Sequence, residues 1–250
     1  MFQGVRAYFS AVTALGAVLL SACAPAAPSG VYDPYEAQNR DVHAFNVGLD
    51  RALVRPAARA YDALLPAPVE QGISNFAHNL DQPGHILNNL LQGRPQYAAQ
   101  NTLRFAVNST FGIAGLFDVS SAIGLPAVET DFGETLHVWG MKEGAYTELP
   151  LLGPSTDRDT LGTIVDFALN PVSKVIPAPE KYVATAAKVG SKLGDRSRFE
   201  GTVDSLLYES ADGYAQLRLL YLQKRRFELG QTAAEAEAEF VDPYEDPYAQ

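Results

Sequence analysis

The 250-residue chain carries 29 acidic and 19 basic side chains, which gives a formal net charge of −10. Its length suffices for one compact domain or two small ones. The acidic balance argues against nucleic acid as a partner, because the phosphate backbone requires basic patches, and against adhesion to anionic lipid by charge alone.

The first 22 residues have the pattern of a bacterial lipoprotein signal peptide. Arg6 supplies a charged start, and residues 9–20 form an apolar stretch that is too short to span a bilayer. The sequence Leu-Ser-Ala then leads directly to Cys23, the only cysteine of the chain. An apolar residue, two small residues and a cysteine form a lipobox, in which the thiol receives a lipid. A plain secretory signal with an incidental cysteine is the alternative, but the position of Cys23 favours cleavage between Ala22 and Cys23.

Acylation of Cys23 decides the compartment of the mature chain. Two or more acyl chains anchor a protein stably, because each buried methylene contributes about 0.8 kcal/mol. The acylated thiol leaves no cysteine for a disulfide. In bacterial lipoproteins an aspartate after the cysteine retains the protein at the inner membrane, and this chain has Ala24 there. We therefore expect a lipid-anchored protein on the periplasmic face of a Gram-negative outer membrane, with the covalent acyl lipid and no other cofactor.

Composition divides the chain into four segments. Residues 1–22 are the predicted signal peptide, and residues 23–32 form a flexible tether of small residues and proline. Residues 33–230 form the predicted helical domain. Residues 231–250 contain six acidic side chains and no lysine or arginine, which predicts a disordered acidic tail.

Helical spacing of apolar residues predicts a mostly α fold. The predicted helices are 34–64 with a break or kink at Pro56, 68–80, 83–92, 95–112, 115–122, 157–169, 178–193, 198–209 and 211–229. Pro83 separates two of them, because proline removes a hydrogen bond from a helix interior. The segment 144–152 is extended before Pro150, which predicts one small hairpin or irregular loop.

Three helix N-caps are predicted from local patterns. Asp33 precedes a proline and a glutamate, as at the start of many helices. Thr156 with Asp159, and Ser197 with Glu200, have the spacing of a capping box.

No mature segment has the roughly 20 consecutive apolar residues of a spanning helix. The nearest candidate is Phe105 to Val128, whose only charge is Asp118. Its interruptions are Gly112, Gly115, Gly124 and Pro126. Two interpretations stay open from composition: a buried helical hairpin in a soluble core, which composition favours, or short helices that lie within one leaflet.

The sequence contains no catalytic constellation that we can identify. The four histidines are His43, His78, His85 and His137. They form no zinc-hydrolase motif, and acylation removes the single cysteine as a nucleophile. A metal site at His78, Asp81 and His85 is one interpretation, and polar helix ends before Pro83 are the favoured one. Asp157, Arg158 and Asp159 could likewise imitate an acid–base cluster, but a helix N-terminus capped by acids explains them better. We expect neither a catalytic nor a metal site.

Asparagines are unusually frequent in the otherwise apolar helices. They are Asn75, Asn79, Asn88, Asn89, Asn101 and Asn108. Asparagine is a mediocre helix former, so its repeated use requires a reason. Capping and surface exposure are the favoured explanation. The functional alternative is a polar but uncharged strip that accepts phosphate and headgroup contacts.

Ordered sequence blocks from about residue 33 to 172, continuing weakly to about 230, carry a family resemblance. They read DPYE with Asn39-Arg40 and Phe45-Asn46, RPA at 55–57 with Tyr61, SNF at 74–76 with Asn79-Leu80, LLQG at 90–93, Arg104-Phe105 with Asn108, GLFDV at 115–119, DFGETL at 131–136 with Trp139-Gly140, and LPLLGPS at 149–155 with Arg158-Asp159. On these blocks the chain resembles the MlaA (VacJ) family of bacterial outer-membrane lipoproteins.

The resemblance implies a fold and a function. Members of this family form a ring-like bundle of short amphipathic helices that sits in the periplasmic leaflet beside trimeric porins. A central channel lets phospholipids misplaced in the outer leaflet pass toward a soluble periplasmic lipid carrier, which maintains lipid asymmetry. The resemblance therefore favours helices within one leaflet for residues 105–128. A lipoprotein that scaffolds porins or envelope machinery, and an envelope lipid hydrolase, are the alternatives.

Six residues of the segment 101–118 are the candidate passage. Asn101, Arg104, Asn108 and Asp118 are candidate channel liners, because polar groups along the inner face would receive a headgroup. Gly112 and Gly115 are candidate hinges. On this interpretation, a bulky replacement of either glycine slows phospholipid clearance without lowering protein abundance.

Overall fold

The computed structural model describes residues 31–170, 177 and 180–230. The predicted signal peptide, the lipobox, most of the tether and the acidic tail lie outside these residues. Asp33–Gln231 form one compact unit, and everything below refers to that unit alone. Its elements are helices apart from one two-stranded sheet, so the expected mostly α class with one small hairpin is confirmed.

The first helical segment continues through the proline that was expected to break it. Helix α2 (Glu36–Leu49), the π-helical turn η1 (Asp50–Val54) and helix α3 (Arg55–Leu64) follow one another without a gap. The wider π-turn absorbs the mismatch before Pro56: the N–H of Arg55 donates to the carbonyl of Asp50, five residues earlier. Of the predicted break or kink at Pro56, the break is therefore wrong, and the irregularity takes the form of a π-turn just before the proline.

Helix α4 (Ala67–Leu91) corrects a second proline prediction. It includes Pro83 in its interior, where two separate helices were expected. Proline leaves one helical carbonyl without its N–H donor. Three neighbours pack against the continuous helix, namely α5 (Pro95–Thr110), α7 (Phe132–Val138) and α10 (Glu180–Arg198).

The region 111–138 differs most from the prediction. A helix was expected over 115–122, but α6 covers only Val119–Ala122, and turns precede it. Helix α7 (Phe132–Val138) was not predicted. It begins at Asp131, whose side chain accepts a hydrogen bond from the N–H of Glu134 at 2.8 Å. Asp131 is a typical N-cap residue and was the local indication of this helix. Helical spacing of apolar residues did not predict it, because seven residues are too few to show that spacing.

The predicted hairpin is confirmed. Strands β1 (Tyr146–Leu149) and β2 (Gly153–Thr156) pair antiparallel, with Tyr146 opposite Thr156. Helix α8 (Asp157–Leu169) follows at once, and the Thr156 side chain accepts from the N–H of Asp159 at 3.3 Å, as the capping-box spacing predicts.

The C-terminal helices have other caps than expected. Helix α10 ends at Arg198, and α11 (Glu200–Asp204), the π-turn η2 (Ser205–Glu209) and α12 (Gly213–Glu228) follow. The predicted Ser197 cap is wrong, because Phe199 occupies the N-cap of α11 without a side-chain bond. Asp212 caps α12 instead, accepting from the N–H of Ala215 at 3.0 Å.

Asp33 does not cap helix α2 either. Tyr35 is the N-cap residue there and makes no side-chain bond. The Asp33 carboxylate instead accepts hydrogen bonds from Asn39, at 2.9 Å, and from Tyr214 and Arg218 of α12. The predicted cap thus joins the two ends of the helical domain.

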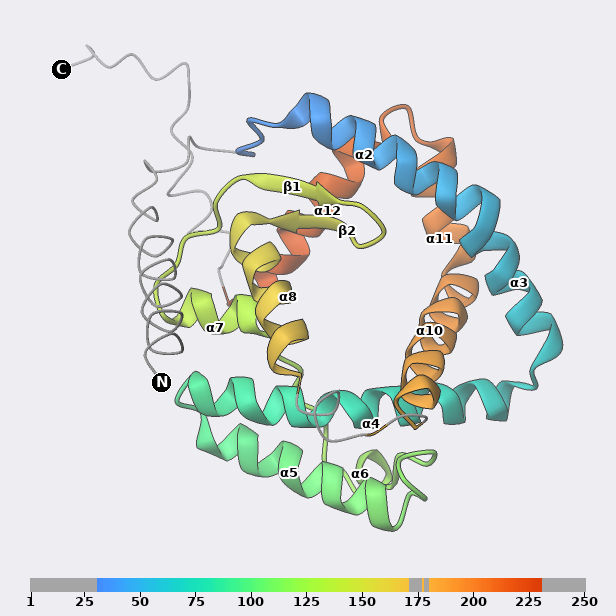
Figure 1. Cartoon of the computed structure of the whole chain (residues 1–250), viewed down its shortest axis with the longest axis vertical. Coiled ribbons are helices and arrows are strands. Elements are labelled where there is room, and N and C mark those ends of the chain that lie inside the picture. Colours follow the sequence, from blue (N-terminus) through green and yellow to red (C-terminus); the bar gives the residue numbers. More distant parts are fainter. Residues whose placement is uncertain (1–30, 171–176, 178–179, 231–250) are drawn as a thin grey trace, which may run out of the picture. The chain divides into compact units, whose positions relative to one another are not determined.

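The packed elements form a closed circuit. In order of contact it runs α2, η1, α3, α10, α4, α7, α8, β2, β1 and back to α2. Figure 1 shows these ribbons one after another around a central area, with α5 and α6 outside α4. A second arc through α11, η2 and α12 joins α10 to β2. The expected ring-like arrangement is therefore observed within this unit.

Polar and apolar side chains are distributed in the reverse of an ordinary soluble core. Among the described residues, more than twice as many polar or charged side chains as hydrophobic ones are buried. Of the six asparagines singled out from the sequence, Asn79, Asn88, Asn89, Asn101 and Asn108 are buried. Capping and surface exposure, the favoured explanation, is therefore wrong for these five. Large hydrophobic side chains on many elements are exposed instead, which marks an interaction or membrane surface.

Candidate functional site

Helix α5 is an amphipathic helix that buries its polar face and exposes its apolar face. Its buried stripe consists of Ala98, Asn101, Arg104 and Asn108, at spacings of three and four residues. Its exposed side carries apolar residues such as Leu103. A helix that docks on a soluble core places its residues the other way round. Three of the candidate channel liners, Asn101, Arg104 and Asn108, lie on this stripe, which is not uncharged because it includes Arg104.

The buried stripe of α5 is held by Asp118. The guanidinium of Arg104 donates to both carboxylate oxygens of Asp118, at 3.0 and 3.1 Å, and the Asn108 amide donates to one of them at 2.9 Å. Partial burial raises the pKa of Asp118, but hydrogen bonds from Ser121, Asn108 and Arg104 outweigh burial and hold that pKa at about 2. The cluster is therefore polar and ionised while its two charges neutralise each other.

Asn101 forms hydrogen bonds with the backbone of the segment that follows α6. Its amide nitrogen donates to the carbonyl of Val128 at 2.7 Å, and its amide oxygen accepts from the N–H of Val128 at 3.1 Å. One side chain thereby satisfies both backbone groups of a residue that lies outside any regular element. The structure thus brings together Arg104, Asn108 and Asp118, and places Asn101 beside them on the same helix face. Their role as channel liners stays a prediction.

Gly112 and Gly115 lie where the backbone approaches other atoms closely. A Cβ at Gly112 would lie 2.2 Å from the carbonyl oxygen of Phe117, and a Cβ at Gly115 would lie 2.5 Å from the Cβ of Asn79. The φ of Gly115 is +99°, and Ile113 and Ala114 between the two glycines also have positive φ. These contacts indicate a tightly packed turn, and a bulky replacement would also lower protein abundance. The hinge role is not tested by the structure.

We expect Gly112→Ala to lower the free energy of unfolding by about 1–3 kcal/mol, because the added methyl group overpacks a site bounded by backbone. Chemical denaturation of the protein in detergent measures the change. Gly48→Ala is the matched control. A Cβ there meets nothing within 4 Å, and alanine is the better helix former. Equal stability of the two variants would contradict the close packing at Gly112.

The region around α5 and α6 exposes an apolar surface, which we call the apolar lobe. Its exposed large hydrophobic residues are Leu103, Phe111, Ile113, Leu116, Phe117 and Ile123. Between residues 103 and 123 the only charged side chains are Arg104 and Asp118, which pair with each other. Within the part of the chain that the structure describes, no helix combines the length and apolar character needed to cross a membrane.

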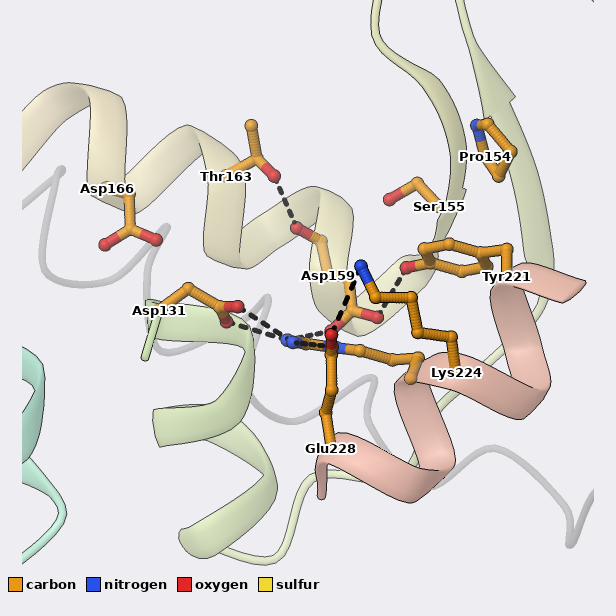
Figure 2. Close-up of a pocket in the computed structure, with 10 residues that line it drawn as sticks. Asp131, Pro154, Ser155, Asp159, Thr163, Asp166, Tyr221, Lys224 and Glu228 are labelled. Carbon is orange, nitrogen blue, oxygen red and sulfur yellow. Dashed lines mark hydrogen bonds and ion pairs between the residues drawn. The ribbon is translucent and has the colours of Figure 1, made fainter. Parts of the chain in front are cut away.

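A second charged cluster joins α12 to the N-terminal ends of α7 and α8. Arg225 donates to both oxygens of Asp131, at 2.8 and 2.7 Å, and to Asp159 at 3.0 Å. Figure 2 labels Asp131, Asp159 and Tyr221 of this cluster, and the Tyr221 hydroxyl donates to Asp159 at 2.7 Å. Burial raises the pKa of Asp159, but the charges of Arg158 and Arg225 lower it more. Sequence reasoning missed Arg225 as a hub of this cluster.

Two asparagines of α2, Asn39 and Asn46, form hydrogen bonds with the backbone of the hairpin. The sequence analysis did not identify this role. Asn39 donates to the carbonyl of Tyr146 at 3.1 Å and accepts from the N–H of Glu148 at 2.9 Å. Asn46 does the same for the backbone of Leu149 and Leu151, at 3.0 and 2.8 Å. A spacing of seven residues places both amides on one helix face. That spacing was the signal in the sequence, and the two amides cover an edge of the small sheet.

The histidines do not assemble into a metal site. Residues 31–170, 177 and 180–230 contain no group of three or more His, Cys, Asp or Glu side chains able to hold a metal ion. Nδ1 of His85 lies 2.7 Å from the carbonyl oxygen of Thr130, and Asp81 pairs with Lys188 of α10. Asp159, in the first turn of α8, pairs with Arg158 and Arg225.

These observations define a helical protein with a polar, hydrogen-bonded interior and many large hydrophobic side chains on its surface. The family model described as MlaA lipoprotein matches residues 31–228. The chain belongs to the MlaA lipoprotein family, so the resemblance seen in the sequence is confirmed. This is a family of transport lipoproteins rather than of enzymes.

Relatives and a solved structure support the assignment. The chain is 34% identical, over 86% of each chain, to the intermembrane phospholipid transport system lipoprotein MlaA of Escherichia coli K12. It is 31% identical, over 79% of each chain, to the protein of that name from Haemophilus influenzae. A chain from work described as "Structural basis for maintenance of bacterial outer membrane lipid asymmetry" aligns with a TM-score of 0.66 and 30% identity, covering 79% of this chain and 98% of that one.

Proposed function

We propose that this protein is an outer-membrane lipoprotein, acylated at Cys23, that provides a passive path for phospholipids. It removes phospholipids misplaced in the outer leaflet and thereby maintains lipid asymmetry. The names of its relatives, which describe an intermembrane phospholipid transport system, support this role.

The inverted helix α5 is the observation that carries the proposal. Its apolar side, in the apolar lobe, gains roughly 25 cal/mol per Å² when acyl chains cover it. Its polar side keeps Asn101, Arg104 and Asn108 away from hydrocarbon and hydrogen-bonded. A protein that floats within one leaflet requires this distribution, because unsatisfied polar groups are costly in lipid.

The passage lowers the free-energy barrier for a headgroup to cross the leaflet, and it catalyses no reaction. A phosphate headgroup that crosses hydrocarbon loses its hydration at great cost. A path lined by polar but neutral groups, such as amides and the Arg104–Asp118 pair, replaces part of that hydration without binding either charge strongly. No bond breaks and no nucleotide is consumed. A trimeric porin beside the protein and a soluble periplasmic carrier are the partners that this passage requires on its two sides.

Reconstitution tests this function. Purified mature protein, porin and carrier are placed with vesicles that hold a fluorescent phospholipid, and arrival of that lipid on the carrier is followed. We expect at least a tenfold increase over carrier alone, which corresponds to a barrier lower by about 1.4 kcal/mol. Porin binding without lipid transfer would favour the scaffold instead, and appearance of cleaved lipid would favour a hydrolase.

A further inference from the structure

One site on α2 and α12 holds the segment that precedes the first helix of the domain. The Asp33 carboxylate accepts a hydrogen bond from the Asn39 amide at 2.9 Å, and others from the Tyr214 hydroxyl and the Arg218 guanidinium. The Asp33 side chain is only 3% exposed. A buried carboxylate is stable only where charged and hydrogen-bonding partners replace its lost hydration, so this site is specific for an acidic side chain.

Arg40, Tyr214 and Arg218 form the centre of this site, and we call these three residues the motif site. The guanidinium carbons of Arg40 and Arg218 lie 4.5 and 5.1 Å from the centre of the Tyr214 ring, so the ring contacts both cations. Glu36 pairs with Arg40 at 2.8 Å and lies 3.5 Å from Arg218. The motif site therefore receives two carboxylates, those of Asp33 and Glu36, at a spacing of three residues.

The segment bound at the motif site occurs a second time in the chain. Residues 33–36 read Asp-Pro-Tyr-Glu, and residues 242–245 repeat the same four residues in the same order. Asp-Pro-Tyr follows once more at 246–248. Residues 231–250 contain no lysine or arginine, so the carboxylates of the second copy have no cation close to them in sequence. The repeat thus supplies the two acids that the motif site binds, at the spacing at which it binds them.

The length of the intervening chain allows the second copy to reach the motif site. Arg218 lies about 15 Å from Glu228 along α12, because a helix rises 1.5 Å per residue. Residues 229–241, which separate Glu228 from the second copy, span up to about 43 Å when extended. This length exceeds the distance back along α12 more than twofold, so the reach of the chain does not limit binding.

We propose that the motif site recognises the sequence Asp-Pro-Tyr-Glu, and that residues 242–245 of the same chain bind there when residues 33–36 leave it. The N-terminal copy is favoured in the intact protein, because it continues directly into α2. A copy joined to the site by a long connecting segment has an effective concentration only in the millimolar range. Exchange keeps Arg218 and the Tyr214 hydroxyl paired, since the second copy brings equivalent carboxylates, and it therefore avoids the cost of a buried charge without a partner.

A double-mutant cycle measures this exchange. Asp33→Asn weakens the N-terminal copy, Asp242→Asn with Asp246→Asn weakens the C-terminal repeats, and unfolding of the full mature chain in denaturant and detergent is compared for all four combinations. In the parent background we expect the C-terminal substitutions to change the unfolding equilibrium constant by less than about twofold. In the Asp33→Asn background we expect them to raise it about tenfold, or 1.4 kcal/mol, the effect of losing a ligand present at ten times its Kd.

The matched control removes the same charge from another part of the C-terminal segment. Glu235→Gln with Glu237→Gln lies within residues 231–250 but outside the repeats. We expect this pair to change the unfolding equilibrium constant of the Asp33→Asn protein by less than about twofold, because the motif site does not contact these residues. An additive cycle overturns the proposal, and so does an equal effect of the control pair.

Cross-linking tests the same contact without a destabilised variant. Benzoylphenylalanine replaces Tyr244 in the otherwise unchanged mature chain, and adducts formed on irradiation are mapped by mass spectrometry. We expect adducts within a single chain at residues 36–46 or 211–222, and a lower yield when Asp242→Asn and Asp246→Asn are added. Adducts only between two chains, only at other residues, or in a yield that these substitutions leave unchanged overturn the proposal. Neither measurement involves lipid transfer or a porin, so its outcome is independent of the proposed function.

Discussion

Replacement of Arg225 with methionine is expected to lower the free energy of unfolding by about 3 kcal/mol. Breaking a buried ion pair by removing one partner costs about 3–5 kcal/mol, because the other charge stays buried without compensation. Arg225 is 11% exposed and holds Asp131 and Asp159. The lower end of the range applies because Arg158 remains beside Asp159, at 3.2 Å, and because Asp131 is partly exposed.

The effect is large because Arg225 joins three elements. Its partners lie at the starts of α7 and α8, where Gly133 and Gly162 bring the two backbones into close approach. A Cβ at Gly162 would lie 2.3 Å from the backbone nitrogen of Gly133. Methionine retains the aliphatic length of arginine but cannot bond either carboxylate, so the loss measured is that of the charged contacts.

Unfolding in denaturant with fluorescence detection measures this loss. The single tryptophan, Trp139, ends helix α7 and packs edge-on against Phe132 at 5.7 Å, so its emission reports on the affected region. Lys224→Met is the matched control one residue away. Lys224 is 72% exposed and pairs only with Glu228 in the described contacts, at 3.4 Å, and such surface pairs contribute about 0–1 kcal/mol. A difference below about 1 kcal/mol between the two variants would contradict the role of Arg225.

Local signals in the sequence predicted those elements whose ends are fixed by their own residues. The hairpin at 146–156 follows from a segment that cannot stay helical up to Pro150, and the cap at Thr156 needs only the N–H of Asp159, three residues away. The polar stripe of α5 was also predictable, because a spacing of four residues places Arg104 and Asn108 on one face.

Long-range packing decided the elements that were predicted wrongly. Pro83 carries a local helix penalty, yet α4 continues through it while α10 packs against the helix. Pro56 lies in the first turn of α3, directly after the π-turn, where proline is tolerated. Asp33 has the local context of a cap, but Tyr214 and Arg218, from the far end of the domain, take its carboxylate. Local propensity is a weak prior where such partners compete.

The charged cluster of Figure 2 could not be predicted from spacing. Asp131 and Asp159 lie 94 and 66 residues before Arg225, and nothing in the sequence marks them as neighbours. The sequence therefore predicts the polar face of a helix. The residues that contact this face are brought to it only by the fold.

Replacement of both Phe111 and Phe117 with serine is expected to weaken membrane binding at least a hundredfold. Burial of one phenylalanine contributes about 1.5–3 kcal/mol, so two contribute about 3–6 kcal/mol, and each 1.4 kcal/mol corresponds to a factor of ten. The side chains are 76% and 60% exposed, so their removal leaves the interior of the protein intact. Cosedimentation of a Cys23→Ser protein with phosphatidylcholine vesicles measures the effect without the acyl anchor.

The control for this experiment replaces two phenylalanines outside the apolar lobe with serine. Phe199 and Phe227 are 56% and 82% exposed and lie outside the apolar lobe. If the apolar lobe is the face that enters the leaflet, Phe199→Ser with Phe227→Ser leaves vesicle binding within about threefold of the parent, because neither side chain leaves water on binding. An equal loss in both double variants would mean that exposed hydrophobic surface adheres without regard to place. The inverted helix α5 would then no longer identify the membrane face, since its apolar side would contribute no more than any other exposed patch.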